Sequence, residues 1–130
     1  MKKILLLLII AGVFVACKKD RQSPTTYFGT YELRANYGGI AGIYEKHQPG
    51  NGNILQLNND STFKRYAAGK LEREGRFHIR KIFQTANNLM YDRLFYHDEN
   101  YSTEIHLHND TLTLGTTITD NIATDLVRIK

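Results

Sequence analysis

From Asn53 onward, short runs of apolar and β-branched residues alternate with turn residues at regular intervals. Strands at a spacing of about 8–12 residues, joined by Asn, Asp and Gly turns, are typical of an antiparallel meander. The pattern predicts strands at Ile54–Leu57, Thr62–Ala67, Glu72–Ile82, Leu89–Tyr96, Thr103–His108, Thr111–Gly115 and Ala123–Lys130. The clearest hairpin is joined by Asn109-Asp110, and no helix of useful length is predicted.

Two earlier segments complete the pattern. Tyr27–Ala35 places Tyr31 and Leu33 on one face and polar residues on the other, so it predicts a half-buried first strand. The next segment, from Asn36 to Asn53, is rich in glycine. It predicts a long mobile loop with room for a brief strand, and such loops are often functional.

The first sixteen residues have the parts of a secretory signal, with Lys2 and Lys3 before an apolar run. That run is shorter than the roughly 20 residues that span a bilayer. It ends in Phe14-Val15-Ala16-Cys17, which resembles the lipobox of bacterial lipoproteins. The resemblance implies cleavage before Cys17, acylation (palmitate) of this single cysteine and anchoring in the outer membrane. Ordinary signal cleavage and a signal anchor are the alternatives.

The predicted organisation is therefore a signal peptide over 1–16, a lipidated Cys17 and tether over 17–26, and one domain over 27–130. Lys2 and Lys3 carry two of the four net positive charges, and the other basic residues are scattered among acids. This charge pattern gives no argument for nucleic-acid binding. Eight tyrosines and no tryptophan suit a β-rich fold.

The domain also resembles the small lipocalin-like lipoproteins of bacteria. The similar stretches are Gly29-Thr30-Tyr31-Glu32-Leu33, Asp60-Ser61-Thr62-Phe63, Gly75-Arg76-Phe77-His78-Ile79 and Leu126-Val127-Arg128-Ile129. The resemblance implies an all-β antiparallel meander closed into a small barrel that holds an apolar ligand. It also implies that Arg128 packs over Tyr31, which stands where lipocalins have a signature tryptophan, and so closes the barrel.

Six aromatic side chains are candidates for the wall or mouth of a pocket, although filling the core is the alternative for each. They are Tyr31, Tyr37, Tyr44, Phe63, Phe77 and Phe95. The glycine-rich segment that carries Tyr37 and Tyr44 would either gate the barrel mouth or plug it. A cavity of roughly 300 Å³ or more would favour a ligand. A filled barrel would favour a structural lipoprotein that docks another envelope component.

The sequence gives little support for a catalytic site. No serine sits in a Gly-x-Ser-x-Gly elbow, and the paired carboxylates lie among polar neighbours, so we expect no enzyme and no cofactor. Glu104, His106 and His108 lie two apart on one strand and share a face, a spacing that can chelate zinc or copper. A solvated strand face is the simpler interpretation, and no metal site is predicted.

Overall fold

The structure is a computed structural model that describes residues 26–84, 88–97, 100, 102–116 and 120–130. The predicted signal peptide and Cys17 lie outside these residues. In the described part of the chain, no helix is long and apolar enough to cross a membrane. Nine strands occur there: β1 Gly29–Gly38, β2 Ile43–Lys46, β3 Ile54–Leu57, β4 Thr62–Ala67, β5 Lys70–Gln84, β6 Leu89–Tyr96, β7 Ser102–His108, β8 Thr111–Leu114 and β9 Ile122–Arg128.

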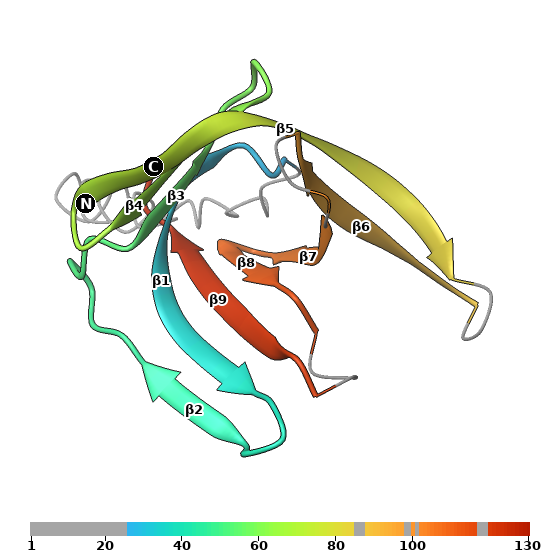
Figure 1. The fold of residues 1–130 in the computed structure, drawn as a ribbon, viewed down its shortest axis with the longest axis horizontal. Coiled ribbons are helices and arrows are strands. Elements are labelled where there is room, and N and C mark those ends of the chain that lie inside the picture. The colour runs from blue at the N-terminus through green and yellow to red at the C-terminus, as the bar shows by residue number, and fades with distance from the viewer. Residues whose placement is uncertain (1–25, 85–87, 98–99, 101, 117–119) are drawn as a thin grey trace, which may run out of the picture.

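These strands form one antiparallel sheet that curls into a closed barrel (Figure 1). Each strand from β3 to β9 pairs with the next along the chain, and β1 pairs with both β3 and β9. Eight of the nine described strands thus close the ring, while β2 pairs only with β1, beside β3. The predicted all-β antiparallel barrel is confirmed.

The glycine-rich segment contains the brief strand for which its prediction left room, but most of the segment is not the predicted long loop. β1 continues to Gly38, the chain turns through Gly39 and Gly42 at positive φ of 71° and 61°, and β2 returns along β1. The predicted loop is therefore a hairpin followed by a short connection to β3. Alternation alone gave neither the bounds of β2 nor its pairing with β1, because β2 is exposed on both faces and has no apolar side.

The core fills the half of the barrel in which β1 begins and β9 ends. Its fully buried large side chains are Tyr31, Leu57, Phe63, Leu94, Ile105 and Leu112. Each contributes about 1.5–3 kcal/mol by leaving water, so this half accounts for much of the hydrophobic stabilisation. We call it the closed end, and the opposite half, where β1 leads into β2, the open end.

Two bulges interrupt the regular alternation of inward and outward side chains. In β1, Leu33 pairs with Leu126 and Ala35 with Asp125, so Arg34 is the extra residue. In β5, Arg73 pairs with Arg65 and Leu71 with Tyr66, so Glu72 is extra. A bulge re-aims the side chains that follow it, and both bulges lie on the open-end side of the core.

Candidate functional site

Arg128 and Tyr31 lie together at the closed end, as neighbours in the register that joins β9 to β1. The Arg128 guanidinium carbon lies 4.9 Å from the centre of the buried Tyr31 ring, and Nη2 donates to Tyr31 Oη at 2.6 Å. Nη2 also donates to Thr26 O at 2.7 Å, and Nη1 donates to Phe28 O. Arg128 therefore joins the last strand to the segment by which the chain enters the barrel.

Gly29 makes this packing possible. A Cβ atom at this position would lie 2.6 Å from Arg128 Nη1 and 3.1 Å from the Lys130 carbonyl oxygen. The guanidinium can lie against β1 only because no side chain occupies that space. The close packing of Arg128 thus explains why a glycine stands two residues before Tyr31.

Tyr27 covers the closed end of the barrel. Its Oη donates to Asp92 Oδ2 at 2.5 Å, and Lys81 Nζ donates to Asp92 Oδ1 at 3.1 Å. Burial, then the bond to Asp92, raises the pKa of Tyr27. Burial alone would raise the pKa of Asp92, but the hydrogen bonds from Tyr27 and Lys81 outweigh it and lower that pKa. The carboxylate is held charged between two donors.

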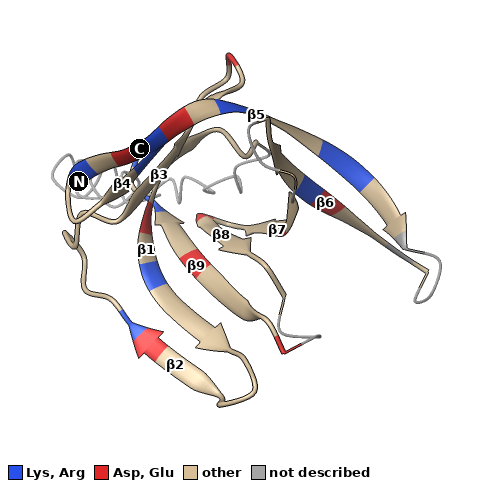
Figure 2. Cartoon of the chain, viewed as in Figure 1, with Lys and Arg blue, Asp and Glu red and all other residues tan. Residues whose placement is uncertain are grey.

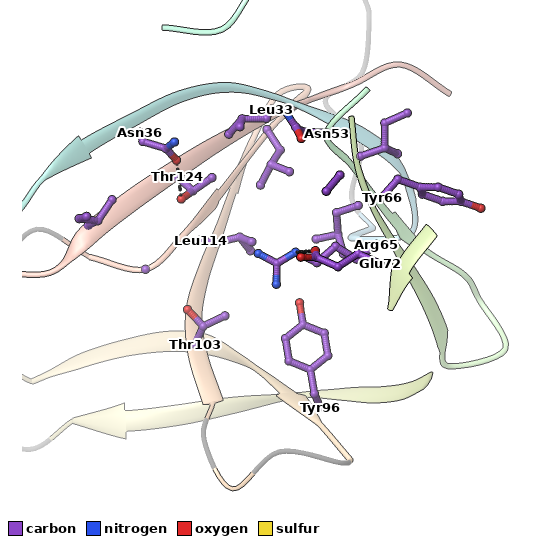
Figure 3. A pocket seen from close by; sticks show the side chains of 16 residues that line it. Leu33, Asn36, Asn53, Arg65, Tyr66, Glu72, Tyr96, Thr103, Leu114 and Thr124 are labelled. Carbon is purple, nitrogen blue, oxygen red and sulfur yellow. Dashed lines mark hydrogen bonds and ion pairs between the residues drawn. The ribbon is translucent and has the colours of Figure 1, made fainter. Parts of the chain in front are cut away.

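The open end holds a cavity of about 470 Å³ (Figure 3). Its apolar lining residues include Leu33, Leu55, Leu114 and Leu126. Its polar lining residues include Asn36, Asn53, Arg65, Glu72, Thr103 and Thr124. The volume lies within the range of small-molecule sites, and the mixed wall suits a molecule with an apolar body and a polar group.

An ion pair lies at the centre of this cavity. Arg65 Nε lies 3.4 Å from Glu72 Oε2, and Figure 3 shows the Tyr96 hydroxyl directed toward the pair. The β5 bulge lets Glu72 share the cavity with Arg65, because the extra residue shifts the alternation of β5. Both side chains are about half exposed at 55%, so the attraction is weak and water reaches both groups. Arg65 is therefore a cation that a ligand anion can approach.

The β1 bulge brings a second polar pair into the wall. Thr124 donates to Asn36 Oδ1 at 3.0 Å, and both residues line the cavity. Tyr37 follows Asn36 and so points to the outer face, where its Oη donates to Asp125 Oδ1 at 3.2 Å. Regular alternation from Tyr31 and Leu33 would have put Tyr37 inside.

None of the six predicted aromatic residues lines the cavity. Tyr31, Phe63 and Phe77 are buried in the core of the closed end. Phe95 lies between the buried Leu94 and Tyr96, faces outward and stacks on His78 at 4.9 Å. Tyr44 on β2 is 65% exposed and Ile40 at the hairpin tip is 90% exposed, so neither plugs the barrel.

The connection from β2 to β3 is fastened to the outside of β1. The buried carboxylate of Glu32 accepts from Gly50 N at 3.1 Å and Gly52 N at 3.4 Å, and pairs with Arg34 Nη1 at 2.6 Å. The bond from Gly50, then that from Arg34, lowers the pKa of Glu32. Asn51 Nδ2 adds a bond to Leu33 O at 2.8 Å. These bonds hold the connection in place at the rim of the open end, next to Asn53.

The two histidines of the candidate metal site lie on the outer face of the barrel. His106 and His108 are exposed and pair with Thr113 and Thr111 across the hairpin, and His106 Nε2 lies 2.9 Å from Glu104 Oε1. Among the residues that the structure describes, no group of three or more His, Cys, Asp or Glu side chains is arranged to hold a metal ion. Comparison of the chain with protein-family models, with curated proteins and with solved structures gives no match.

Proposed function

We propose that the protein is a lipid-anchored envelope protein with a lipocalin-like barrel, and that the barrel binds a small amphipathic molecule at its open end. The observation that supports binding is the cavity of about 470 Å³, which is lined by both leucines and Arg65. An apolar body would lie against the leucines, and an anionic or strongly polar group would meet Arg65 in place of Glu72. The resemblance to lipocalins implied a small apolar ligand, and the polar lining residues are the reason for this change.

Binding can be tested with 8-anilinonaphthalene-1-sulfonate, whose apolar rings and sulfonate match the apolar and basic lining residues. Its fluorescence should rise and saturate when wild-type protein is added. Arg65→Gln should weaken binding about tenfold, since a charge-assisted hydrogen bond contributes about 1.5–3 kcal/mol.

Lys64→Gln is the matched control. Lys64 precedes Arg65 on β4 and pairs with Glu74 at 3.4 Å, the same separation as the Arg65–Glu72 pair. Lys64 faces outward, so Lys64→Gln should leave the dye affinity unchanged. If the wild-type protein does not bind the dye, or if both variants lose affinity equally, the cavity is not the binding site. The chain is then better explained as an interaction protein whose filled core supports an outer docking face.

Anchoring rests on Cys17 and its lipobox-like context. Each buried methylene contributes about 0.8 kcal/mol, so several acyl chains would make dissociation from a membrane negligible. Cys17→Ser should release the protein from the membrane fraction or leave the precursor uncut. Equal membrane association of both forms, with the signal peptide still present, would contradict the proposal.

A further inference from the structure

The open-end cavity contains one cation and one anion among its described lining residues, Arg65 and Glu72. The other polar side chains that line it are neutral amides and hydroxyls, from Asn36, Asn53, Tyr66, Tyr96, Thr103 and Thr124. The two formal charges cancel. The described lining therefore selects neither anions nor cations by net charge, and the arrangement of the two charges decides which polar group fits.

A further cation nearby belongs to the core rather than to the cavity. Figure 2 shows red and blue segments in succession along the first part of β5, where Arg73 follows Glu72. Arg73 is directly opposite Arg65 on β4 and is not a lining residue. Its guanidinium carbon lies over the rings of Phe63 and Tyr96, at 5.6 Å and 5.5 Å from their centres. Among the described residues, a bound molecule thus meets the charges of Arg65 and Glu72.

A ligand that brings only an anion would give Glu72 an unfavourable neighbour. Arg65 Nε lies 3.4 Å from Glu72 Oε2, so an anion bonded to the guanidinium would lie within a few ångströms of the carboxylate. Like charges at that separation repel, and the repulsion grows as the apolar body of the ligand displaces water from around them. Such a ligand would gain one charge-assisted bond and leave a carboxylate without its partner.

The other simple ligands meet corresponding costs. A ligand that brings only a cation would pair with Glu72 and leave Arg65 beside a like charge. An uncharged apolar molecule would cover the existing ion pair and remove it from water, which costs free energy. A ligand with both charges can replace each partner of the pair. Because Arg65 and Glu72 are in contact, the two charges of this ligand must also be neighbours.

From this geometry we propose that the open-end cavity binds a zwitterionic amphiphile of the α-amino acid kind. Its carboxylate meets Arg65, its ammonium group meets Glu72, and its apolar chain lies against leucines such as Leu55 and Leu114. The inference rests on the proposed function, because it needs the cavity to be a binding site. It adds the cation that the ligand carries and gives Glu72 a role in binding.

Three compounds with similar apolar chains test the proposal on the wild-type protein. 2-Aminooctanoate is a zwitterion, 2-hydroxyoctanoate is an anion with a hydroxyl in place of the ammonium group, and octylammonium is a cation. Titration calorimetry below the concentrations at which they form micelles gives the affinity of each. 2-Aminooctanoate should bind about fivefold more tightly than either of the others, since it alone pairs with both side chains.

Glu72→Gln should change the affinities for two of these compounds in opposite directions. Binding of 2-aminooctanoate should weaken about fivefold, whereas binding of 2-hydroxyoctanoate should become tighter because the repelling carboxylate is gone. Glu74→Gln is the matched control. Glu74 pairs with Lys64 at 3.4 Å and its side chain is 58% exposed, close to the 55% of Glu72, but it does not line the cavity. Its replacement should leave all three affinities unchanged.

The results separate this inference from the proposed function. If 2-hydroxyoctanoate or octylammonium binds the wild-type protein as tightly as 2-aminooctanoate, the zwitterion is wrong and the cavity remains a binding site. Equal effects of Glu72→Gln and Glu74→Gln also overturn the inference. If neither 8-anilinonaphthalene-1-sulfonate nor any of the three compounds binds, the proposed function fails and the inference fails with it. The comparison on the wild-type protein needs no variant, so poor folding of Glu72→Gln would not prevent the test.

Discussion

The two ends of this barrel use the same kinds of residue in opposite ways. At the closed end, Arg128 and Asp92 are each held by donors or acceptors from several segments, over a filled core. At the open end, Arg65 and Glu72 make one ion pair at 3.4 Å and are half exposed. A charged residue with many fixed partners stabilises the fold, whereas one with a single weak partner keeps its capacity to bind something else.

The comparison also divides the lipocalin-like stretches. Gly29, Tyr31 and Arg128 of these stretches lie at the closed end, whereas Leu33 and Leu126 of the same stretches line the cavity. Gly29, Tyr31 and Arg128 close the ring and hold the entering chain, and none of these three lines the cavity. The polar lining residues that would select a ligand, such as Arg65 and Thr103, belong to none of the similar stretches.

The largest effect is expected at Tyr31. Tyr31→Ala removes a fully buried ring and the stacking surface of Arg128, which should lower the free energy of unfolding by about 3–5 kcal/mol. Tyr31→Phe keeps the ring and loses only the hydroxyl bonds, so its loss should be smaller. Urea unfolding of the wild-type protein and the two variants measures both losses of stability. Equal losses for the two variants would mean that the ring packing contributes nothing beyond its hydroxyl.

An intermediate and pH-dependent effect is expected at Asp92. Because its pKa is lower in the folded protein than in the unfolded chain, its charge stabilises the fold above the unfolded pKa of about 3.9. That stabilisation is lost as the pH falls through the lower folded value. Asp92→Asn should therefore cost about 1.5–3 kcal/mol at pH 7 and progressively less in acid. A cost that does not change between pH 7 and pH 3 would show that the carboxylate charge is not the cause.

The smallest effect on stability is expected at the open end. Arg65→Gln removes a half-exposed ion pair and should change the free energy of unfolding by no more than about 1 kcal/mol. Lys64→Gln should do the same on the outer face of β4. Thermal and urea unfolding compare the two directly. A large loss for Arg65→Gln alone would mean that Arg65 supports the fold, and the contrast between the ends would be lost.

The sequence predicted the strands well because apolar side chains alternate wherever one face is buried. The predicted bounds of β3, β4 and β6 coincide with those observed. Phe95 could also have been placed correctly, since its neighbours Leu94 and Tyr96 take the inner face. The order of apolar residues along the chain thus predicts most of the strands and their inward-facing side chains.

The open end was not predictable in the same way. A bulge depends on how two strands pair, and nothing in the composition around Arg34 or Glu72 indicates an extra residue. The first bulge turned Asn36 inward and Tyr37 outward, and the second put Glu72 beside Arg65. The cavity wall therefore follows from cross-strand register, which a single sequence does not contain.

The most direct test of the proposed binding site is to find the residues whose NMR signals shift when a ligand binds. Backbone amide signals would be followed by NMR as 8-anilinonaphthalene-1-sulfonate is added to the 15N-labelled chain. We expect saturable shifts around Arg65, Thr103, Leu114 and Thr124, with Leu57 and Leu112 at the closed end unchanged. Shifts centred on the closed end or the outer face, or no saturable shift at all, would contradict the claim that the open end is a binding site.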